Sequence, residues 1–258
     1  MADLSKIQDA IADEQESNVE AVLARGMRQA IRGYAEADVV ALPPGFRDEV
    51  EAVLVGLWTA SAQATGAGLI DEFRAYGFDH METKQDEETL FERIVQEFLE
   101  RFGASKVTQI VSATRDQLFR IVQQGQREGL GITQIAKLMR DQVSELSRLR
   151  AHVIARTETH TSSMYAAQQV ARTSRRPLMK EWVSAEDSRT RDFGEGDGVV
   201  DEFSHRAMNG VRVNMSEPYM VPTKYGTREP LMFPGDPSGS PGNTIMCRCV
   251  ETYHRQED

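Results

Sequence analysis

The chain has little of what stabilises small secreted proteins or anchors membrane proteins. It has 2 cysteines in 258 residues, and Cys247 and Cys249 stand too close together for an unstrained disulfide. No run of roughly 18 apolar residues is present, and the opening Met-Ala-Asp-Leu-Ser-Lys lacks the basic and then apolar layout of a secretory signal. We therefore expect a soluble protein of a reducing, intracellular compartment, with no membrane partner.

Proline is also scarce in the first two thirds of the chain. Only Pro43 and Pro44 occur before residue 177, and the other seven of the 9 prolines lie from Pro177 onward. Because proline lacks a backbone donor and clashes with the preceding helical turn, its scarcity permits long helices. Apolar spacing and capping residues predict helices over about 4–41 and 46–76, from Asp86, from Ser105 to the glycines of 125–131, from Thr133, and from Leu146 to about Arg175.

After residue 176, short apolar runs alternate with Gly, Pro, Asn and Asp. Strands are predicted at 180–184, 211–214, 231–233 and 246–253. The predicted fold class is α+β, in which a long-helix N-terminal part precedes a small, mixed α/β, loop-rich C-terminal domain. We place a helical assembly region at 1–130 and the C-terminal domain at 131–258, with a helical lead-in over 131–176 and a compact part over 177–258.

Charge is distributed unevenly along the chain, whose net charge is −10. Residues 1–104 hold 9 Lys/Arg against 21 Asp/Glu, residues 105–176 hold 12 against 5, and residues 177–258 hold 9 against 14. A basic middle segment could contact phosphates or an acidic protein surface, and the alternative is a merely solvated helical face. The candidate contact residues are Arg115, Arg120, Arg127, Lys137 and Arg140.

Near the C-terminus, thiol, imidazole and carboxylate groups could bind zinc. Cys247 and Cys249 would face the same side of a strand, and His205, His254 and Asp236 could add ligands. One residue between the cysteines is fewer than in most zinc sites, so packing beneath a loop is the favoured interpretation. We expect no cofactor, with zinc as the ion that these residues could hold.

Other chemistries have weaker support. A cysteine nucleophile activated by Arg248 and His205 would also need an oriented base and an oxyanion site. The carboxylates of residues 181–201 lack the calcium-loop spacing, so solvated turns are favoured. Residues 129–139 are similar to the start of a helix-turn-helix, but the next segment has a mixed surface, which favours a simple helical hairpin.

Five segments occur in a fixed order: A-R-T-E-T from 155, K-E-W-V-S-A-E-D-S-R-T-R from 180, H-R-A-M-N-G from 205, F-P-G-D-P from 233 and N-T-I-M-C-R-C from 243. Over about residues 130–253 this order resembles the Mu F-like minor head, or head morphogenesis, proteins of tailed bacteriophages. The structural signature comprises Arg156, Glu158, Trp182, Asp187, Arg189, Gly210, Pro234, Gly235, Asn243 and Arg248. Residues 192–203 separate Arg191 from His205, and the corresponding segment is usually shorter in that family. Whether His205 lies beside Arg191 is therefore open.

The resemblance implies a minor head structural protein without catalytic residues. Its partners would be the portal protein and other head proteins, with double-stranded DNA contacted without sequence specificity during packaging or ejection. It would be made in the host cytoplasm and reside in the virion, inside the head at the portal vertex. Residues 1–130 would then provide the portal contact. The alternative is a toxin-like or metal-dependent intracellular enzyme or effector, which the end of the chain shortly after Tyr253 disfavours.

Within the C-terminal domain we expect Trp182 in the core and a pairing between Asp187 and Arg189. Arg156 and Glu158 are expected to belong to a buried polar network that ties the helical part to this domain. A buried charge is costly unless it is paired, so charged signature residues in the interior should have partners of opposite charge or hydrogen-bonding groups.

Overall fold

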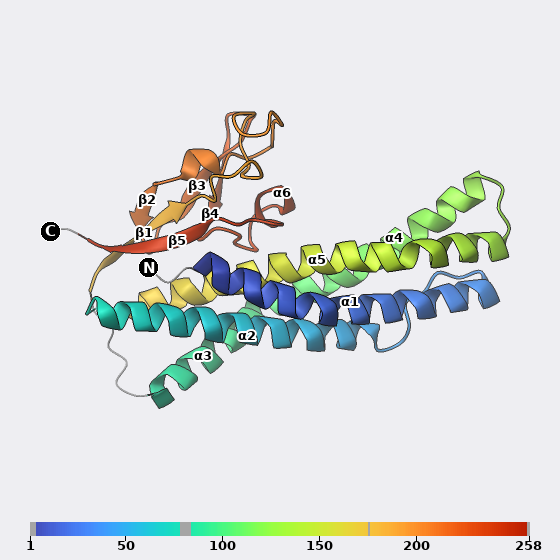
Figure 1. Ribbon diagram of the computed structural model, residues 1–258, viewed down its shortest axis with the longest axis horizontal. Coiled ribbons are helices and arrows are strands. Elements are labelled where there is room, and N and C mark those ends of the chain that lie inside the picture. Colours follow the sequence, from blue (N-terminus) through green and yellow to red (C-terminus); the bar gives the residue numbers. More distant parts are fainter. Residues whose placement is uncertain (1–3, 78–83, 175, 257–258) are drawn as a thin grey trace. The chain divides into compact units, whose positions relative to one another are not determined.

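A computed structural model describes residues 4–77, 84–174 and 176–256 (Figure 1). The fold is α+β, as predicted: long helices come first and short antiparallel strands follow. The helices are α1 (Leu4–Ala37), α2 (Phe46–Ala75), α3 (Lys84–Phe98), α4 (Ala104–Arg127), α5 (Ile132–Arg172) and the short α6 (Pro241–Thr244). The strands are β1 (Leu178–Val183), β2 (Arg212–Asn214), β3 (Tyr219–Pro222), β4 (Arg228–Leu231) and β5 (Val250–Arg255).

The chain stays helical between α3 and α4. A π turn over Leu99–Gly103 joins the two helices, and Gly103 itself has right-handed helical angles. The prediction of Ser105 as an N-cap is therefore wrong, because an N-cap residue itself lies outside the helix, whereas Ser105 and the residues before it are helical. Ser105 lies inside the helix, where its Oγ accepts a hydrogen bond from Gln109 Nε2 at 3.2 Å.

Helix α5 is one helix of 41 residues, where the sequence predicted two. Neither glycine nor proline occurs between Ile132 and Arg172, so the polar stretch before Leu146 does not interrupt the backbone bonds. The predicted end at Arg175 lies outside the described residues. At the start of α5, Gln134 Oε1 accepts a bond from Gly131 N–H at 2.9 Å, and the turn at 128–131 joins α4 to α5 in a helical hairpin. The hairpin that the sequence favoured within residues 129–150 does not form, because residues 132–150 belong to the single helix α5.

The chain divides into two compact units. One comprises Met1–Ile11, Trp58–Phe98 and Arg156–Asp258, and the other comprises Ala12–Leu57 and Leu99–Ala155. In the second unit, α1, α4 and α5 enclose an apolar core. Its most buried members include Met27, Ala30, Ile31, Tyr34, Leu118, Ile135, Ala136 and Met139. The assignment of roles to residues 1–130 and 131–258 stays a prediction.

Within the described residues, α2 is long and apolar enough to cross a membrane by length and composition alone. Half of its most apolar window is buried inside the protein, and Leu54, Leu57, Trp58 and Leu69 are each at most 3% exposed. The core helix of a soluble protein has the same properties, so this criterion does not distinguish the two cases. The expected absence of a membrane partner stays a prediction.

The strands form two small antiparallel sheets in the first unit. The order of the larger sheet is β2-β1-β5, with Glu181 opposite Arg212 and Trp182 opposite Glu251, and β3 pairs with β4. The core of this region contains Trp182, Phe203, Met208, Tyr219, Val221, Leu231, Cys247 and Cys249, which places Trp182 as expected.

Two strand predictions need correction. Of the predicted strand 231–233, only Leu231 lies in a strand, as the last residue of β4. Residues 246–249 precede β5, because a turn over 245–246 delays pairing until Val250. Strand β3 was not predicted: it is only four residues long and ends in Pro222, which the sequence pattern assigns to a loop.

Candidate metal centre

One imidazole and two thiols meet in the core of the first unit. The potential ligand atoms of His205, Cys247 and Cys249 all lie within 4.8 Å of one another. The distance from His205 Nδ1 is 3.6 Å to Cys247 Sγ and 3.5 Å to Cys249 Sγ. All three residues are at most 3% exposed, and both thiols are free. The structure thus brings together three of the five residues named as potential metal ligands.

A turn, and not the expected strand, directs both thiols toward His205. Met246 has a left-handed backbone with φ of 58°, an uncommon conformation for a side-chain-bearing residue. Its N–H donates to Thr157 Oγ1 on α5 at 3.1 Å, and Cys247 N–H donates to Thr244 O at 3.2 Å. These bonds fix the backbone immediately before Cys247.

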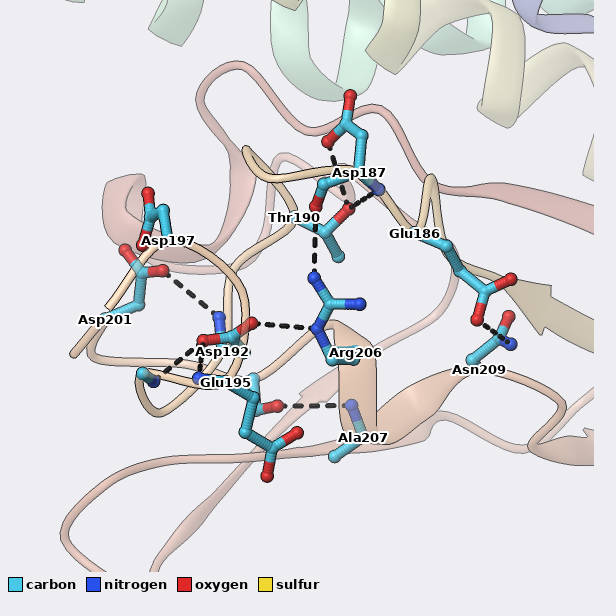
Figure 2. A network of polar contacts seen from close by, with 12 residues as sticks. Glu186, Asp187, Thr190, Asp192, Glu195, Asp197, Asp201, Arg206, Ala207 and Asn209 are labelled. Atoms are coloured by element: carbon cyan, nitrogen blue, oxygen red, sulfur yellow. Dashed lines mark hydrogen bonds and ion pairs between the residues drawn. The ribbon is translucent and has the colours of Figure 1, made fainter. Parts of the chain in front are cut away.

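His205 lies beside Arg191 despite the insertion between them. The N–H groups of His205 and Arg206 both donate to Arg191 O, at 2.9 and 3.1 Å. Figure 2 shows how the loop 192–203 is closed at its base: the Asp192 carboxylate accepts bonds from Gly194 N, Glu195 N and Arg206 Nε. Residues 195–200 of this loop are exposed, whereas Asp192 and Phe203 at its two ends are buried. The inserted segment therefore does not separate His205 from Arg191, and the question that the sequence left open is resolved.

Hydrogen bonds determine which nitrogen of His205 faces the thiols. Asn243 Nδ2 donates to Glu229 Oε2 at 2.7 Å, so Asn243 Oδ1 is the atom that lies 2.6 Å from His205 Nε2. A carbonyl oxygen only accepts, which places the ring proton on Nε2. His205 Nδ1 therefore presents its lone pair to Cys247 and Cys249. The edge-on contact with Trp182, at 5.2 Å between ring centroids, further holds the ring.

A second buried histidine comes from α5. His160 is 3% exposed; its Nδ1 lies 3.2 Å from Gln8 Oε1, and its Nε2 has no hydrogen-bond partner. Gly235 permits this packing, because a Cβ there would lie 2.5 Å from His160 Cδ2. Burial lowers the pKa of His160 to about 4, and Cys249 and His205 are among the ionisable groups that act on it. The sequence analysis missed His160 because a lone histidine in a helix carries no ligand spacing.

The other proposed ligands are engaged elsewhere. The Asp236 carboxylate accepts bonds from Met232 N at 2.8 Å and Ser238 N at 2.9 Å, which holds the loop after β4. His254 Nε2 lies 2.9 Å from Glu181 Oε2 on the larger sheet. Asp236 and His254 are not part of the group of ligand atoms within 4.8 Å.

Asp187 makes its closest ionic contacts with Arg248, not with Arg189. Both of its carboxylate oxygens accept bonds from the Arg248 guanidinium, whereas Arg189 Nη2 lies 3.7 Å away and its side chain is 74% exposed. The Arg248 hydrogen bonds hold the pKa of Asp187 well below its usual range. The planar guanidinium of Arg248 donates two hydrogen bonds to the Asp187 carboxylate, one to each oxygen. This geometry makes Arg248 the closer partner, although Arg189 is nearer in sequence.

The remaining signature residues have structural roles in the first unit. Arg156 Nη1 donates to Asp9 Oδ1 at 2.6 Å, and Glu158 Oε2 accepts from Trp58 Nε1 at 3.0 Å. Gly210 takes a φ of 78° and donates to Trp182 O at 2.8 Å. Pro234 is buried in the loop that carries Gly235 and Asp236.

The five candidate contact residues of the basic segment are all exposed on the α4–α5 hairpin of the second unit. Arg115 lies 3.1 Å from Asp116, with both side chains 58% exposed. Arg150 on α5 donates to Ile110 O and Thr114 Oγ1 on α4. Burial and then the charge of Arg120 lower the pKa of Arg150, which indicates a locally positive field.

Comparison with known proteins gives one match. The model of the family described as Phage Mu protein F like protein matches residues 116–252, more than half of the chain, including α5, both sheets and the cluster of His205, Cys247 and Cys249. Neither the curated proteins nor the solved structures gave a match.

Proposed function

The chain belongs to the Phage Mu protein F like family, and from that membership we propose that it is a minor head protein that associates with the portal vertex during procapsid assembly. The family assignment itself makes it a bacteriophage head morphogenesis protein. The proposal adds the position in the head, a low copy number and contact with DNA.

The observation that carries the proposal is the exposed basic surface of the α4–α5 hairpin. Arg115, Arg120, Arg127, Lys137 and Arg140 all project into solvent in a chain whose net charge is −10. A local basic surface in an acidic protein favours a restricted contact over general coating of nucleic acid. It suits the phosphates of double-stranded DNA, which Lys and Arg contact without reading sequence, and equally an acidic face of the portal.

A non-enzymatic role fits the buried thiols. Cys247 and Cys249 are 3% and 2% exposed, whereas a thiol nucleophile must reach its substrate. Family membership also favours a structural protein over the alternative of an intracellular enzyme or effector. We therefore assign the cluster of thiols and imidazole no catalytic step.

The proposed location predicts a small, fixed number of copies in mature particles. DNA-filled heads should contain a few copies of this chain per particle when its peptides are quantified by mass spectrometry against the major capsid protein. Procapsids purified before packaging provide the control, and they should contain the same number. Complete absence from both particles would instead indicate an effector that acts in the host cell.

Charge reversal tests the basic surface. Replacing the five residues by glutamate should weaken binding to double-stranded DNA, because each lost phosphate contact lowers the slope of log affinity against log salt by about 0.9. Binding is measured at several salt concentrations, and capture of the purified portal protein is measured in parallel.

A matched variant controls for net charge. It carries the same five-fold reversal at other exposed positions, Arg28, Arg93, Arg101, Lys224 and Arg228. Two outcomes would show that the basic surface of the hairpin is only solvated and binds no partner. One is an equal loss of affinity in both variants, and the other is unaltered binding of the first variant to both DNA and portal.

A further inference from the structure

We propose that Cys247, Cys249, His205 and His160 bind one zinc ion. The first three residues supply a preformed set of ligands, and His160 supplies the fourth. The proposal concerns the first unit alone and does not depend on the portal or DNA contacts proposed above.

The distances between the ligand atoms suit tetrahedral zinc. With Zn–S of about 2.3 Å and Zn–N of about 2.0–2.1 Å, a tetrahedral angle separates sulfur from nitrogen by about 3.6 Å. The observed separations from His205 Nδ1 are 3.6 Å to Cys247 Sγ and 3.5 Å to Cys249 Sγ. An ion could therefore sit between these atoms with little movement of the backbone.

The surroundings of His205 are those of a zinc ligand. Its Nε2 proton is held by Asn243 Oδ1, which Glu229 orients through the other end of the amide. Such a second hydrogen bond fixes the tautomer and raises the basicity of the ligating nitrogen. The opposite nitrogen, Nδ1, is the one that faces both thiols.

Charge balance also favours zinc in this buried place. Binding releases the two thiol protons to solvent, and two thiolates with two neutral imidazoles neutralise Zn²⁺. A neutral complex avoids the large cost of an uncompensated buried charge. The ligands are at most 3% exposed, so a protein side chain is a better fourth ligand than water.

His160 is the side chain that fits this fourth position. No hydrogen bond of normal geometry reaches its buried Nε2, although the Pro234 backbone acts on the ring. A buried nitrogen without such a bond requires an explanation. The imidazole lies against Gly235, and Cys249 and His205 are among the groups around it. Since His160 lies outside the group of atoms within 4.8 Å, coordination requires its side chain to move toward the cluster. The ion would then join α5 to the segment that precedes β5.

The full-length chain, purified in the presence of zinc, tests the proposal. Native mass spectrometry should find one zinc per chain, and replacement by Co²⁺ should give the visible spectrum of a tetrahedral site. Cys247→Ser combined with Cys249→Ser should abolish binding. His160→Ala should weaken it by more than about 100-fold, since loss of a ligand exceeds the roughly 10–100-fold cost of losing an orienting partner such as Asn243.

His254→Ala is the matched control, because this partly exposed histidine of β5 pairs with Glu181 outside the cluster and should retain full affinity. X-ray absorption at the zinc edge of the unmodified protein should show two sulfur neighbours and the outer-shell scattering of two imidazole rings, which requires no variant to fold. Failure of the unmodified protein to bind zinc, or retained binding in the double serine variant, would overturn the site. Outer-shell scattering from a single imidazole ring, or unchanged affinity in His160→Ala, would overturn the role of His160.

Discussion

Trp182→Ala is expected to lower the free energy of unfolding by about 3–5 kcal/mol, the usual cost of removing a large aromatic side chain from a core. The Trp182 ring is fully buried between Tyr219 and His205, with centroid distances of 5.2 Å to each. The substitution would leave a cavity in the apolar cluster beneath the thiols. Chemical denaturation followed by circular dichroism measures the loss.

Two further variants separate packing from other causes. Trp182 Nε1 has no hydrogen-bond partner, so Trp182→Phe removes no bond and should cost clearly less than the alanine variant. Tyr225 is 71% exposed, and Tyr225→Ala should change stability by no more than about 0.5 kcal/mol. A loss below about 1 kcal/mol in Trp182→Ala would contradict the central place of this residue in the core.

At alkaline pH, Lys180→Met is expected to destabilise the protein by about 3–5 kcal/mol, because it leaves the buried Glu251 carboxylate without a nearby positive charge. Lys180 and Glu251 are 0% and 1% exposed on the neighbouring strands β1 and β5. Lys180 Nζ donates to Met232 O and lies 4.8 Å from the centroid of the Tyr219 ring. Burial lowers the pKa of Lys180 and raises that of Glu251, while each charge counteracts the shift of the other.

Removing both charges should restore most of the loss. In Lys180→Met with Glu251→Leu, no charge has to be buried, and such replacements are often neutral or stabilising. The exposed pair Arg25 and Glu49, whose side chains are 49% and 42% exposed, provides the control, and the equivalent double substitution should cost about 0–1 kcal/mol. A double variant at 180 and 251 as unstable as the single one would show that the pair matters through shape and not through charge.

The same carboxyl group predicts how stability changes with pH. Burial raises the pKa of Glu251 from 4.5 to about 7, so the folded state binds more protons than the unfolded state between these values. The contribution of Glu251 to the free energy of unfolding therefore decreases as pH rises from about 4.5 to about 7, and it levels off above that range. The penalty of Lys180→Met should accordingly be larger at alkaline than at mildly acidic pH, since a protonated Glu251 needs no partner.

The sequence predicted the helical part well because its elements depend on local rules. Apolar spacing and the proline pair at 43–44 locate α1 and α2 to within a few residues. Local rules failed where contacts between residues distant in sequence determine the backbone conformation. The π turn at Leu99–Gly103 keeps the chain helical past Ser105, and an uninterrupted α5 passes through a polar stretch that resembles a boundary.

Part of the membership of the candidate site was predictable from the sequence, but its geometry was not. Cys247, Cys249 and His205 could be named from residue type, yet their convergence depends on a left-handed Met246 and on bonds from Thr157 and Asn243. No spacing rule identifies His160, which approaches from a helix through contacts with Gly235. The pairing of Asp187 with Arg248 joins residues 61 positions apart, whereas sequence reasoning favoured the neighbour, Arg189.

The closed base of the loop 192–203 makes this segment a suitable place for genetic insertion. Arg191 O accepts hydrogen bonds from the N–H groups of both His205 and Arg206, and the Asp192 carboxylate accepts one from Arg206 Nε. These bonds hold the two ends of the loop together independently of the residues at its tip. A change in the length of the exposed tip would therefore leave the hydrogen bonds at the base of the loop in place. A small fluorescent or epitope tag placed between Glu195 and Val199 would leave the histidine in register, and it would offer a means of following this protein through head assembly in infected cells.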